Sequence, residues 1–552
     1  MRRRKRKRHR DVLLIALLVA IATIALCPSP AKAADGDRVN VDTPLGPVVG
    51  QARNGVSVFL GLPFAGPPVG EYRFAPPRDP QGWKEPREAF RPGPMCVQAP
   101  MELFQASVAP DNAFPGYSED CLYLNVWAPE GAKAGDGLPV YVFIHGGGYS
   151  VGSGSEKGYD GSALAREGLV VVNVNYRLGA LGFLASKETM AQYGTTGNWG
   201  LLDQVKALEW VRDNVTAFGG DPAKVTIGGE SAGSFSVSGL ILSPLAGGLF
   251  RQAIMQSGTI LALDVCLYPK GEPDLAYAIH ALFASLFKAK DDAAGLAKLR
   301  ALDPALLIHL SPFSVDFTTP SLFGPSPIKD GHVLPPDPMG TLAKGEGKKV
   351  KVLMGFNGNE GSMFVPARDD GDVPPRYADS VGAMLGLEGA KAFWDRFPVD
   401  KDHGMVERVR QAVSYAFMSS NMKRFADLHA RKADVYFYRF DYVTGLGEAA
   451  GLGAYHTSEL PFVFGNKEAL DNSSHDERAL SDDIRLRWVN FIKNGDPNVG
   501  LDPPTRVAWP RYDPKKPEAM VFGKTVSAKP LPDADNLEFV ADIIYGPLPQ
   551  TP

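Results

Sequence analysis

The sequence predicts an α/β fold: a large, mostly parallel central sheet with helices on both faces and a helical cap formed by insertions. Continuous apolar runs alternate with helix-like segments along the chain, a pattern typical of parallel strands buried on both faces. Two helix-rich stretches, about 265–345 and 362–432, interrupt this alternation without a Pro/Gly-rich linker. We therefore expect one large domain, with these two stretches as its cap.

The expected strands are short β-branched and aromatic runs. They lie within 121–129, 138–148, 168–179, 225–229, 251–258, 348–361 and 433–442. A helical pattern over 198–215 leads into the strand at 225–229, and a second helical pattern follows that strand. Repeated alternation of strand and helix favours a sheet covered by helices on both faces.

The N-terminus has the pattern of a secretory signal. A basic block (1–10) precedes an apolar run of fifteen residues (12–26), and an A-x-A site ends at Ala33. We expect cleavage after Ala33, which makes 1–33 a signal peptide and 34–552 a single secreted or periplasmic domain. An uncleaved anchor is the alternative, although the run is short for a membrane span. Lipid attachment at Cys27 is disfavoured because the bulky Leu26 precedes it.

The charge of the mature chain argues against nucleic acid as a partner. The whole chain has a formal net charge of −4, but removing 1–33 takes away nine Lys/Arg and one Asp, which leaves 49 basic and 61 acidic residues and a charge of −12. Phosphate contacts need a cationic surface, which this composition does not favour. After signal removal we expect no stable membrane anchor and a small-molecule substrate.

Ser231 is the candidate nucleophile. It is the centre of a G-x-S-x-G pattern, Gly229 to Gly233, with a β-branched strand before it and a helical pattern after it. A strand that turns at once into a helix needs small neighbours and raises the serine hydroxyl above the sheet. A glycine-rich turn without chemistry is the alternative, but the flanking strand and helix favour the nucleophile elbow.

A serine needs a base, and His456 is the candidate. In α/β-hydrolases the acid and then the histidine follow the serine in the chain, each on a loop after a later strand. His456 lies in such a loop, after the strand within 433–442. His429, in a charged helix-like stretch, and His475, in a polar segment, are interpreted as surface residues.

The acid that orients this histidine is predicted to be Glu360. It follows the strand within 348–361, whereas Asp330 precedes that strand and Asp441 lies in or just after the next one. In this role the carboxylate orients the imidazole and stabilises the imidazolium.

The oxyanion of an acyl-transfer intermediate needs preorganised N–H donors. Gly146, Gly147 and Gly148 follow a strand directly, and the N–H of Ala232 follows the nucleophile. The sequence has no G-K-[ST] or G-x-G-x-x-G phosphate motif, no zinc-spaced Cys/His cluster and no H-E-x-x-H. We therefore expect neither a cofactor nor a metal.

These motifs resemble those of the type-B carboxylesterases, the α/β-hydrolase family of cholinesterases, bacterial para-nitrobenzyl esterases and neuroligins. The resemblance runs from about residue 38 to the C-terminus and is most specific at 119–129 and 218–233. It implies the same triad, an oxyanion hole of Gly147, Gly148 and Ala232, a carboxylate at Glu230, and a supporting pair, Ser257 and Glu459. It also implies a disulfide between Cys96 and Cys121; Cys266 is then a buried free thiol.

One departure bears on the substrate. Cholinesterases hold a cation-binding tryptophan ten residues before the second cysteine of this disulfide loop, where the chain has Asp111. Without that aromatic face, choline esters are poor candidates. We expect an exported serine carboxylesterase that acts through an acyl-enzyme. The alternatives are an amidase on the same triad and a non-catalytic, neuroligin-like binding module. The sequence does not indicate the preferred acyl or alcohol group, or the oligomeric state.

Overall fold

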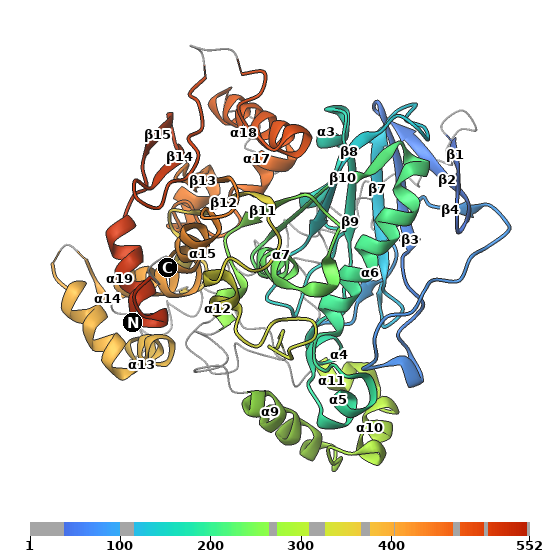
Figure 1. Ribbon diagram of the computed structural model, residues 1–552, viewed down its shortest axis with the longest axis horizontal. Helices are drawn as coiled ribbons and strands as arrows, with labels where there is room; N and C mark the ends of the chain where they lie inside the picture. The colour runs from blue at the N-terminus through green and yellow to red at the C-terminus, as the bar shows by residue number, and fades with distance from the viewer. Residues whose placement is uncertain are drawn as a thin grey trace, which may run out of the picture.

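A sheet of thirteen strands runs through the described part of the chain (Figure 1). The computed structural model describes residues 38–99, 115–263, 273–308, 326–365, 376–401, 403–466, 475–501 and 506–548. The strands of this sheet are β1 (Arg38–Thr43), β2 (Gly46–Arg53), β3 (Val56–Pro63), β4 (Arg87–Glu88), β7 (Tyr123–Pro129), β8 (Leu138–Ile144), β9 (Val170–Val174), β10 (Gly220–Glu230), β11 (Gln252–Gln256), β12 (Lys351–Asn357), β13 (Val435–Phe440), β14 (Glu518–Phe522) and β15 (Val526–Pro530). A separate pair is formed by β5 (Met95–Cys96) and β6 (Tyr117–Ser118).

The sheet is mixed, with a parallel centre. Its order is β1-β2-β3-β7-β9-β8-β10-β11-β12-β13-β14-β15, and β4 pairs with β2. Neighbouring strands from β9 to β14 pair in parallel, whereas β1, β2, β3, β7 and β15 join their neighbours antiparallel. The parallel arrangement predicted from the sequence therefore holds for the centre. Short turns connect the antiparallel pairs β1–β2, β2–β3 and β14–β15.

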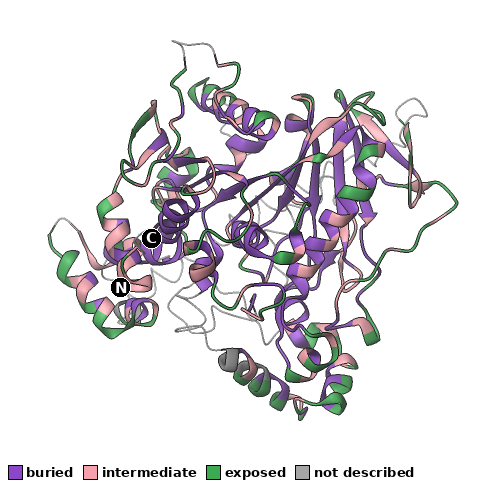
Figure 2. Cartoon of the chain, in the orientation of Figure 1, coloured by how far each residue is buried: buried purple, intermediate pink, exposed green. Residues whose placement is uncertain are grey.

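The central strands carry mostly apolar side chains because both faces of the sheet are covered (Figure 2). Along β8, Val140, Val142 and Ile144 belong to one buried cluster. Tyr141 and Phe143 alternate with them and belong to a second cluster on the opposite face. Successive side chains of a strand point to opposite faces, so a strand between two cores carries apolar side chains on both of its faces.

Most helices connect successive strands of the sheet. Two groups of helices lie in the stretches predicted to be helix-rich, about 265–345 and 362–432. The helices that join the strands of the sheet are α3 (Ser162–Arg166), α4 (Gly179–Phe183), α5 (Lys187–Tyr193), α6 (Trp199–Asn214), α7 (Ala232–Leu242), α16 (Gly445–Ala450), α17 (Leu460–Phe464), α18 (His475–Asn494) and, at the C-terminus, α19 (Ala534–Tyr545). Between β11 and β12 are α9 (Pro273–Leu286), α10 (Ala293–Arg300), α11 (Pro304–Ile308) and α12 (Pro338–Ala343); between β12 and β13 are α13 (Arg376–Arg396), α14 (Met405–Val413), a π-helical turn η9 (Ser414–Ser419) and α15 (Ser420–His429).

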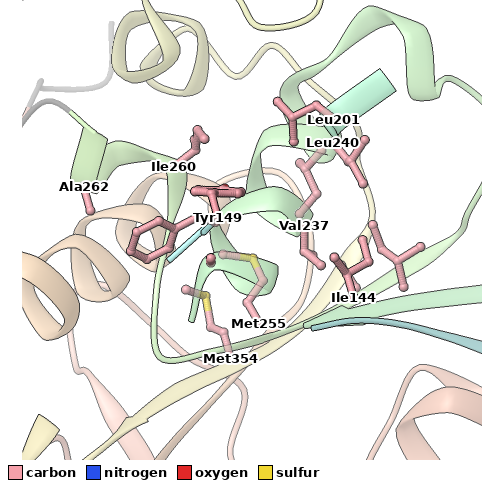
Figure 3. Close-up of a cluster of buried hydrophobic side chains, with 14 of the residues drawn as sticks. Ile144, Tyr149, Leu201, Val237, Leu240, Met255, Ile260, Ala262 and Met354 are labelled. Carbon is pink, nitrogen blue, oxygen red and sulfur yellow. The ribbon is translucent and has the colours of Figure 1, made fainter. Parts of the chain in front are cut away.

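Helix α7 is buried along its whole length, which fixes the turn that precedes it. Figure 3 shows Val237 and Leu240 of α7 packed among buried side chains that include Ile144 of β8, Met255 of β11 and Met354 of β12. Burying a large aliphatic side chain contributes about 1.5–3 kcal/mol. The N-terminal end of α7 is therefore held rigidly at the C-terminal edge of the parallel strands.

Two segments that stand out in the sequence, 119–129 and 198–215, each contribute a carboxylate to an ion pair, Glu119 and Asp203 respectively. Arg73 donates two hydrogen bonds to Glu119, at 2.7 and 2.6 Å, and Arg177 donates two to Asp203, at 2.8 and 2.7 Å. These charges are nearly buried and each pair is bidentate, the geometry that compensates best for desolvation. Both arginines also donate to backbone carbonyls, which ties loops to the sheet.

A disulfide joins Cys96 of β5 to Cys121, just before β7, as the resemblance implied. Three other sequence predictions, the signal peptide at 1–33, the free thiol of Cys266 and the substitution at Asp111, fall outside the described residues. Across the described ranges, no helix combines the length and the apolar character needed to cross a membrane.

The disulfide gives a stability prediction. Replacing both cysteines (Cys96→Ala with Cys121→Ala) removes a cross-link between residues 25 apart and should lower the free energy of unfolding by about 3 kcal/mol. The measurement is the thermal midpoint of wild type and variant, each with and without reductant. Reductant should lower the wild-type midpoint and leave the variant unchanged; a wild-type midpoint insensitive to complete reduction would contradict the prediction.

Candidate active site

Ser231 lies at the junction between β10 and α7 with a strained backbone, φ 55° and ψ −124°. Its glycine neighbours are required by close backbone approach. A Cβ on Gly229 would lie 2.4 Å from the carbonyl carbon of Gly233, and a Cβ on Gly233 would lie 2.0 Å from the oxygen of Ile144. The Ser231 N–H donates to Gln256 O at 2.9 Å. A backbone conformation outside the favoured φ/ψ regions persists only where the surrounding packing over-determines it, as here.

Glu360 and His456 meet on the loops that follow β12 and β13. The Nδ1–H of His456 faces Glu360 Oε2 at 2.6 Å, and both side chains are buried. Glu360 begins a 3-10 turn, η8 (Glu360–Ser362), and its other oxygen accepts the Asn357 N–H at 2.7 Å. With Nδ1 protonated and bound to the carboxylate, Nε2 is the ring nitrogen that can accept a proton.

The imidazole is directed toward the segment that carries the serine. Its Nε2 lies 3.2 Å from Oε1 of Glu230, the residue before Ser231. Within the described part of the chain, the Ser231 hydroxyl makes no hydrogen bond to His456. A hydroxyl rotates freely about its own bonds, and catalytic hydrogen bonds commonly tighten only when substrate binds.

The glycine loop after β8 lies against the nucleophile. A Cβ on Gly146 would be 3.1 Å from Ser231 Cβ, so this loop and the serine are in direct contact. Gly147 and Gly148 have φ of 100° and 59°, and no described residue accepts a hydrogen bond from either N–H. Ala232 is the first residue of α7, where an N–H has no intrahelical acceptor. These three amides can therefore stabilise an oxyanion.

Three buried carboxyl groups surround the single imidazole. Burial raises the pKa of Glu230 well above its usual range, against the opposing effect of His456. Burial alone would lower the pKa of His456, but the negative charges of Glu230 and Glu360 outweigh this effect and raise it to about 9. Burial and the charge of Glu360 raise the pKa of Glu459 as well. The more negative charge these carboxyl groups carry, the more firmly His456 holds its proton.

The two residues of the supporting pair implied by the resemblance, Ser257 and Glu459, have different surroundings. Glu459 is buried beside the triad, but its two oxygens accept hydrogen bonds from Gln256 Nε2, at 2.8 Å, and Asn357 Nδ2, at 2.6 Å. The hydroxyl of Ser257 is buried and has no hydrogen-bond partner among the described residues. Ser257 and Glu459 therefore make no direct hydrogen bond to each other.

The structure corrects one assignment and separates the rival acids from the site. His429 is buried, not on the surface: its Nε2 lies 2.8 Å from Val350 O, and burial lowers its pKa to about 4. Helix α19 covers α15, so polar residues on α15 are buried in ion pairs. His475 is exposed, as predicted. Asp330 accepts three backbone N–H groups of its own loop, and Asp441 pairs with Arg439.

Several residues of the site were not found from the sequence. Gln256 and Asn357 end β11 and β12 and hold Glu459, and Phe364 packs on His456 with ring centroids 5.0 Å apart. Polar residues at the carboxyl ends of parallel strands are the signal that could have identified the two amides. Over the described residues, no group of His, Cys, Asp or Glu has the arrangement of a metal site.

Comparison with known proteins shows similarity to carboxylesterases along most of the chain. The model of the carboxylesterase family matches residues 37–540. The fumonisin B1 esterase of Sphingopyxis macrogoltabida is 36% identical over 492 residues, 86% of this chain and 84% of that protein. The para-nitrobenzyl esterase of Bacillus subtilis is 34% identical over 519 residues, 90% of this chain and 97% of that protein.

Solved structures show the same similarity. A PNB esterase superposes with a TM-score of 0.77 at 32% identity and covers 91% of this chain and 99% of its own. A carboxylesterase of Geobacillus stearothermophilus superposes with a TM-score of 0.75 at 32% identity and covers 90% and 99%.

The charge around His456 gives a pH prediction. Glu230→Gln removes the carboxyl group nearest to Nε2 and, with it, the negative charge that this group carries when ionised, so the pKa of His456 should fall and the acidic limb of kcat/KM should move to lower pH. The measurement is kcat/KM for an ester whose rate does not depend on leaving-group protonation, from pH 5 to pH 10. Glu448→Gln, an exposed carboxylate on α16, is the control and should leave the limb in place. A limb that stays fixed or moves to higher pH in Glu230→Gln would contradict the prediction.

Proposed function

Because this chain belongs to the carboxylesterase family, and is therefore a carboxylic ester hydrolase, we propose that it works through an acyl-enzyme formed on Ser231. The α/β-hydrolase fold predicted from the sequence is confirmed by the solved structures that it resembles. In this proposal His456 is the general base and acid, and Glu360 orients it. The observation that carries the proposal is the buried Glu360–His456 contact beside a strained serine.

The first half of the reaction forms the acyl-enzyme. His456 Nε2 accepts the proton of Ser231 as the serine oxygen attacks the ester carbonyl carbon, and the carbonyl oxygen becomes an oxyanion. The N–H groups of Gly147, Gly148 and Ala232 stabilise that charge, each by about 3 kcal/mol. The tetrahedral intermediate collapses, the C–O bond to the alcohol breaks, and His456 gives its proton to the leaving oxygen.

The second half hydrolyses the acyl-enzyme. A water molecule takes the place of the alcohol, His456 accepts one of its protons, and the hydroxide attacks the acyl carbon. Collapse of this intermediate returns the proton to Ser231 and releases the carboxylic acid. The ring stays in one orientation throughout because Glu360 holds Nδ1–H at 2.6 Å.

Ser231→Ala tests the mechanism. The variant should lose about 10⁴-fold or more in kcat on a panel of esters varied separately in acyl chain and alcohol. Ser243→Ala, directly after the opposite end of α7, is the matched control and should keep wild-type turnover. Full turnover by Ser231→Ala would refute the proposal. Matched anilides should react far more slowly than the esters; equal rates would indicate an amidase instead.

Export is the second part of the proposal, supported by the basic block, apolar run and A-x-A site of residues 1–33. Expression of the full chain in a bacterium should place the protein outside the cytoplasm, with Ala34 as its first residue. Intact mass and N-terminal sequencing of the secreted or periplasmic fraction check this outcome. A full-length protein that stays with the membrane would instead indicate an uncleaved anchor.

A further inference from the structure

Two loops bring the proposed acid and base together. The acid loop, residues 357–362, follows β12, and the base loop, residues 453–459, precedes α17. β12 and β13 pair in parallel up to Asn357 and Phe440, so the acid loop leaves the sheet beside the strand that leads to the base loop. Asn357, the last residue of β12, is buried at this point.

Asn357 contacts both loops at once. Its backbone N–H donates to Glu360 Oε1 at 2.7 Å. Its side-chain Nδ2 donates to the carbonyl oxygen of Tyr455, at 2.8 Å, and to Glu459 Oε2, at 2.6 Å. Tyr455 precedes His456 directly, and Glu459 follows it by three residues. The main chain of Asn357 therefore holds the acid, and its side chain holds the base loop on both sides of the imidazole.

A second asparagine adds to this connection. Asn359 N–H donates to Ala454 O at 2.9 Å, and its side-chain oxygen accepts the Ala454 N–H at 3.0 Å. Asn359 and Tyr455 also form an isolated parallel bridge. The contacts of Asn359 thus join the acid and base loops independently of Asn357. Substitution of the Asn357 side chain should therefore loosen the base loop without separating it from the acid loop.

We propose that Asn357 is a positioning residue for ester hydrolysis: its amide fixes the base loop so that His456 faces both Glu360 and the nucleophile segment. This inference rests on the proposed roles of Ser231, His456 and Glu360. The amide of Asn357 offers two N–H donors without a charge, one for each of two separate acceptors, a carbonyl and a carboxylate. Removing the donors leaves both acceptors buried and unsatisfied.

Asn357 also affects the charges that face the imidazole. These groups are Glu230 from β10, Glu360 from η8 and Glu459 from the base loop itself. The hydrogen bond from Asn357 favours the ionised form of Glu459. Without it, Glu459 holds its proton more readily and His456 faces less negative charge. Substitution of Asn357 should therefore shift the pH dependence of the reaction. Substitution of a residue with a purely structural role would not produce this shift.

The test compares Asn357→Leu, which keeps the side-chain shape without donors, with Asn357→Ala, which removes bulk as well. Both should lower kcat by about 10- to 100-fold, because small misplacements of catalytic groups carry costs of this size. KM should change less than about twofold, because no substrate contact is removed. In both variants the acidic limb of kcat/KM should move to lower pH. Asn357→Ala decides the test if Asn357→Leu does not accumulate as folded protein.

Asn198→Ala is the matched control. Asn198 is buried, and its side chain makes two hydrogen bonds with Ile328, at 2.9 and 3.0 Å, away from the loops of the site. Its loss should lower the thermal midpoint comparably and leave kcat and the pH profile unchanged.

Two results would overturn the inference. The first is wild-type kcat and pH profile in the Asn357 variants. The second is an Asn198→Ala variant with the same loss of kcat and the same pH shift. Ser231→Ala, assayed in parallel, separates this failure from failure of the proposed function: an inactive Ser231→Ala beside active Asn357 variants refutes only the role of Asn357.

Discussion

The proposed mechanism depends on one buried contact, the 2.6 Å approach of Glu360 Oε2 to His456 Nδ1. Neither group is favourable alone in the interior, because an unpaired charge or an unpaired N–H loses its water without compensation. Together, with Asn357 N–H on the second carboxylate oxygen, they are satisfied. The pair fixes which imidazole nitrogen is available to a nucleophile and in which direction it points.

The parallel centre of the sheet makes this contact possible. The loops that carry Ser231, Glu360 and His456 all leave the sheet at the carboxyl ends of its strands, where side chains from distant parts of the sequence meet. The serine is placed there by a backbone strained to φ 55°, and the buried helix α7 supplies the packing that maintains it. Packing of α7 in the core therefore keeps Ser231 in a fixed position at the site.

The sequence points to candidate site residues where local requirements are strict. Ser231 is a candidate because the strand-to-helix turn around it has no room for a side chain at 229 and 233, as the close backbone contacts of both glycines bear out. Glu360 and His456 could be chosen by their order after strands. Asn357 and Gln256 were not found: their place at the carboxyl ends of strands can be recognised in the sequence, but their roles arise from contacts with segments about a hundred or more residues away. His429 was assigned wrongly because the charges around it suggested solvent, whereas α19 covers that helix and pairs with them.

The most direct measurement of the central claim is covalent labelling of the nucleophile. A fluorophosphonate reacts with a serine only when a neighbouring base removes its proton and amide donors stabilise the developing charge. Intact mass spectrometry should show one adduct per chain, and peptide mapping should place it on Ser231, with residual esterase activity falling in proportion to labelling. An adduct on another residue, or complete labelling of Ser231 with activity retained, would contradict the account.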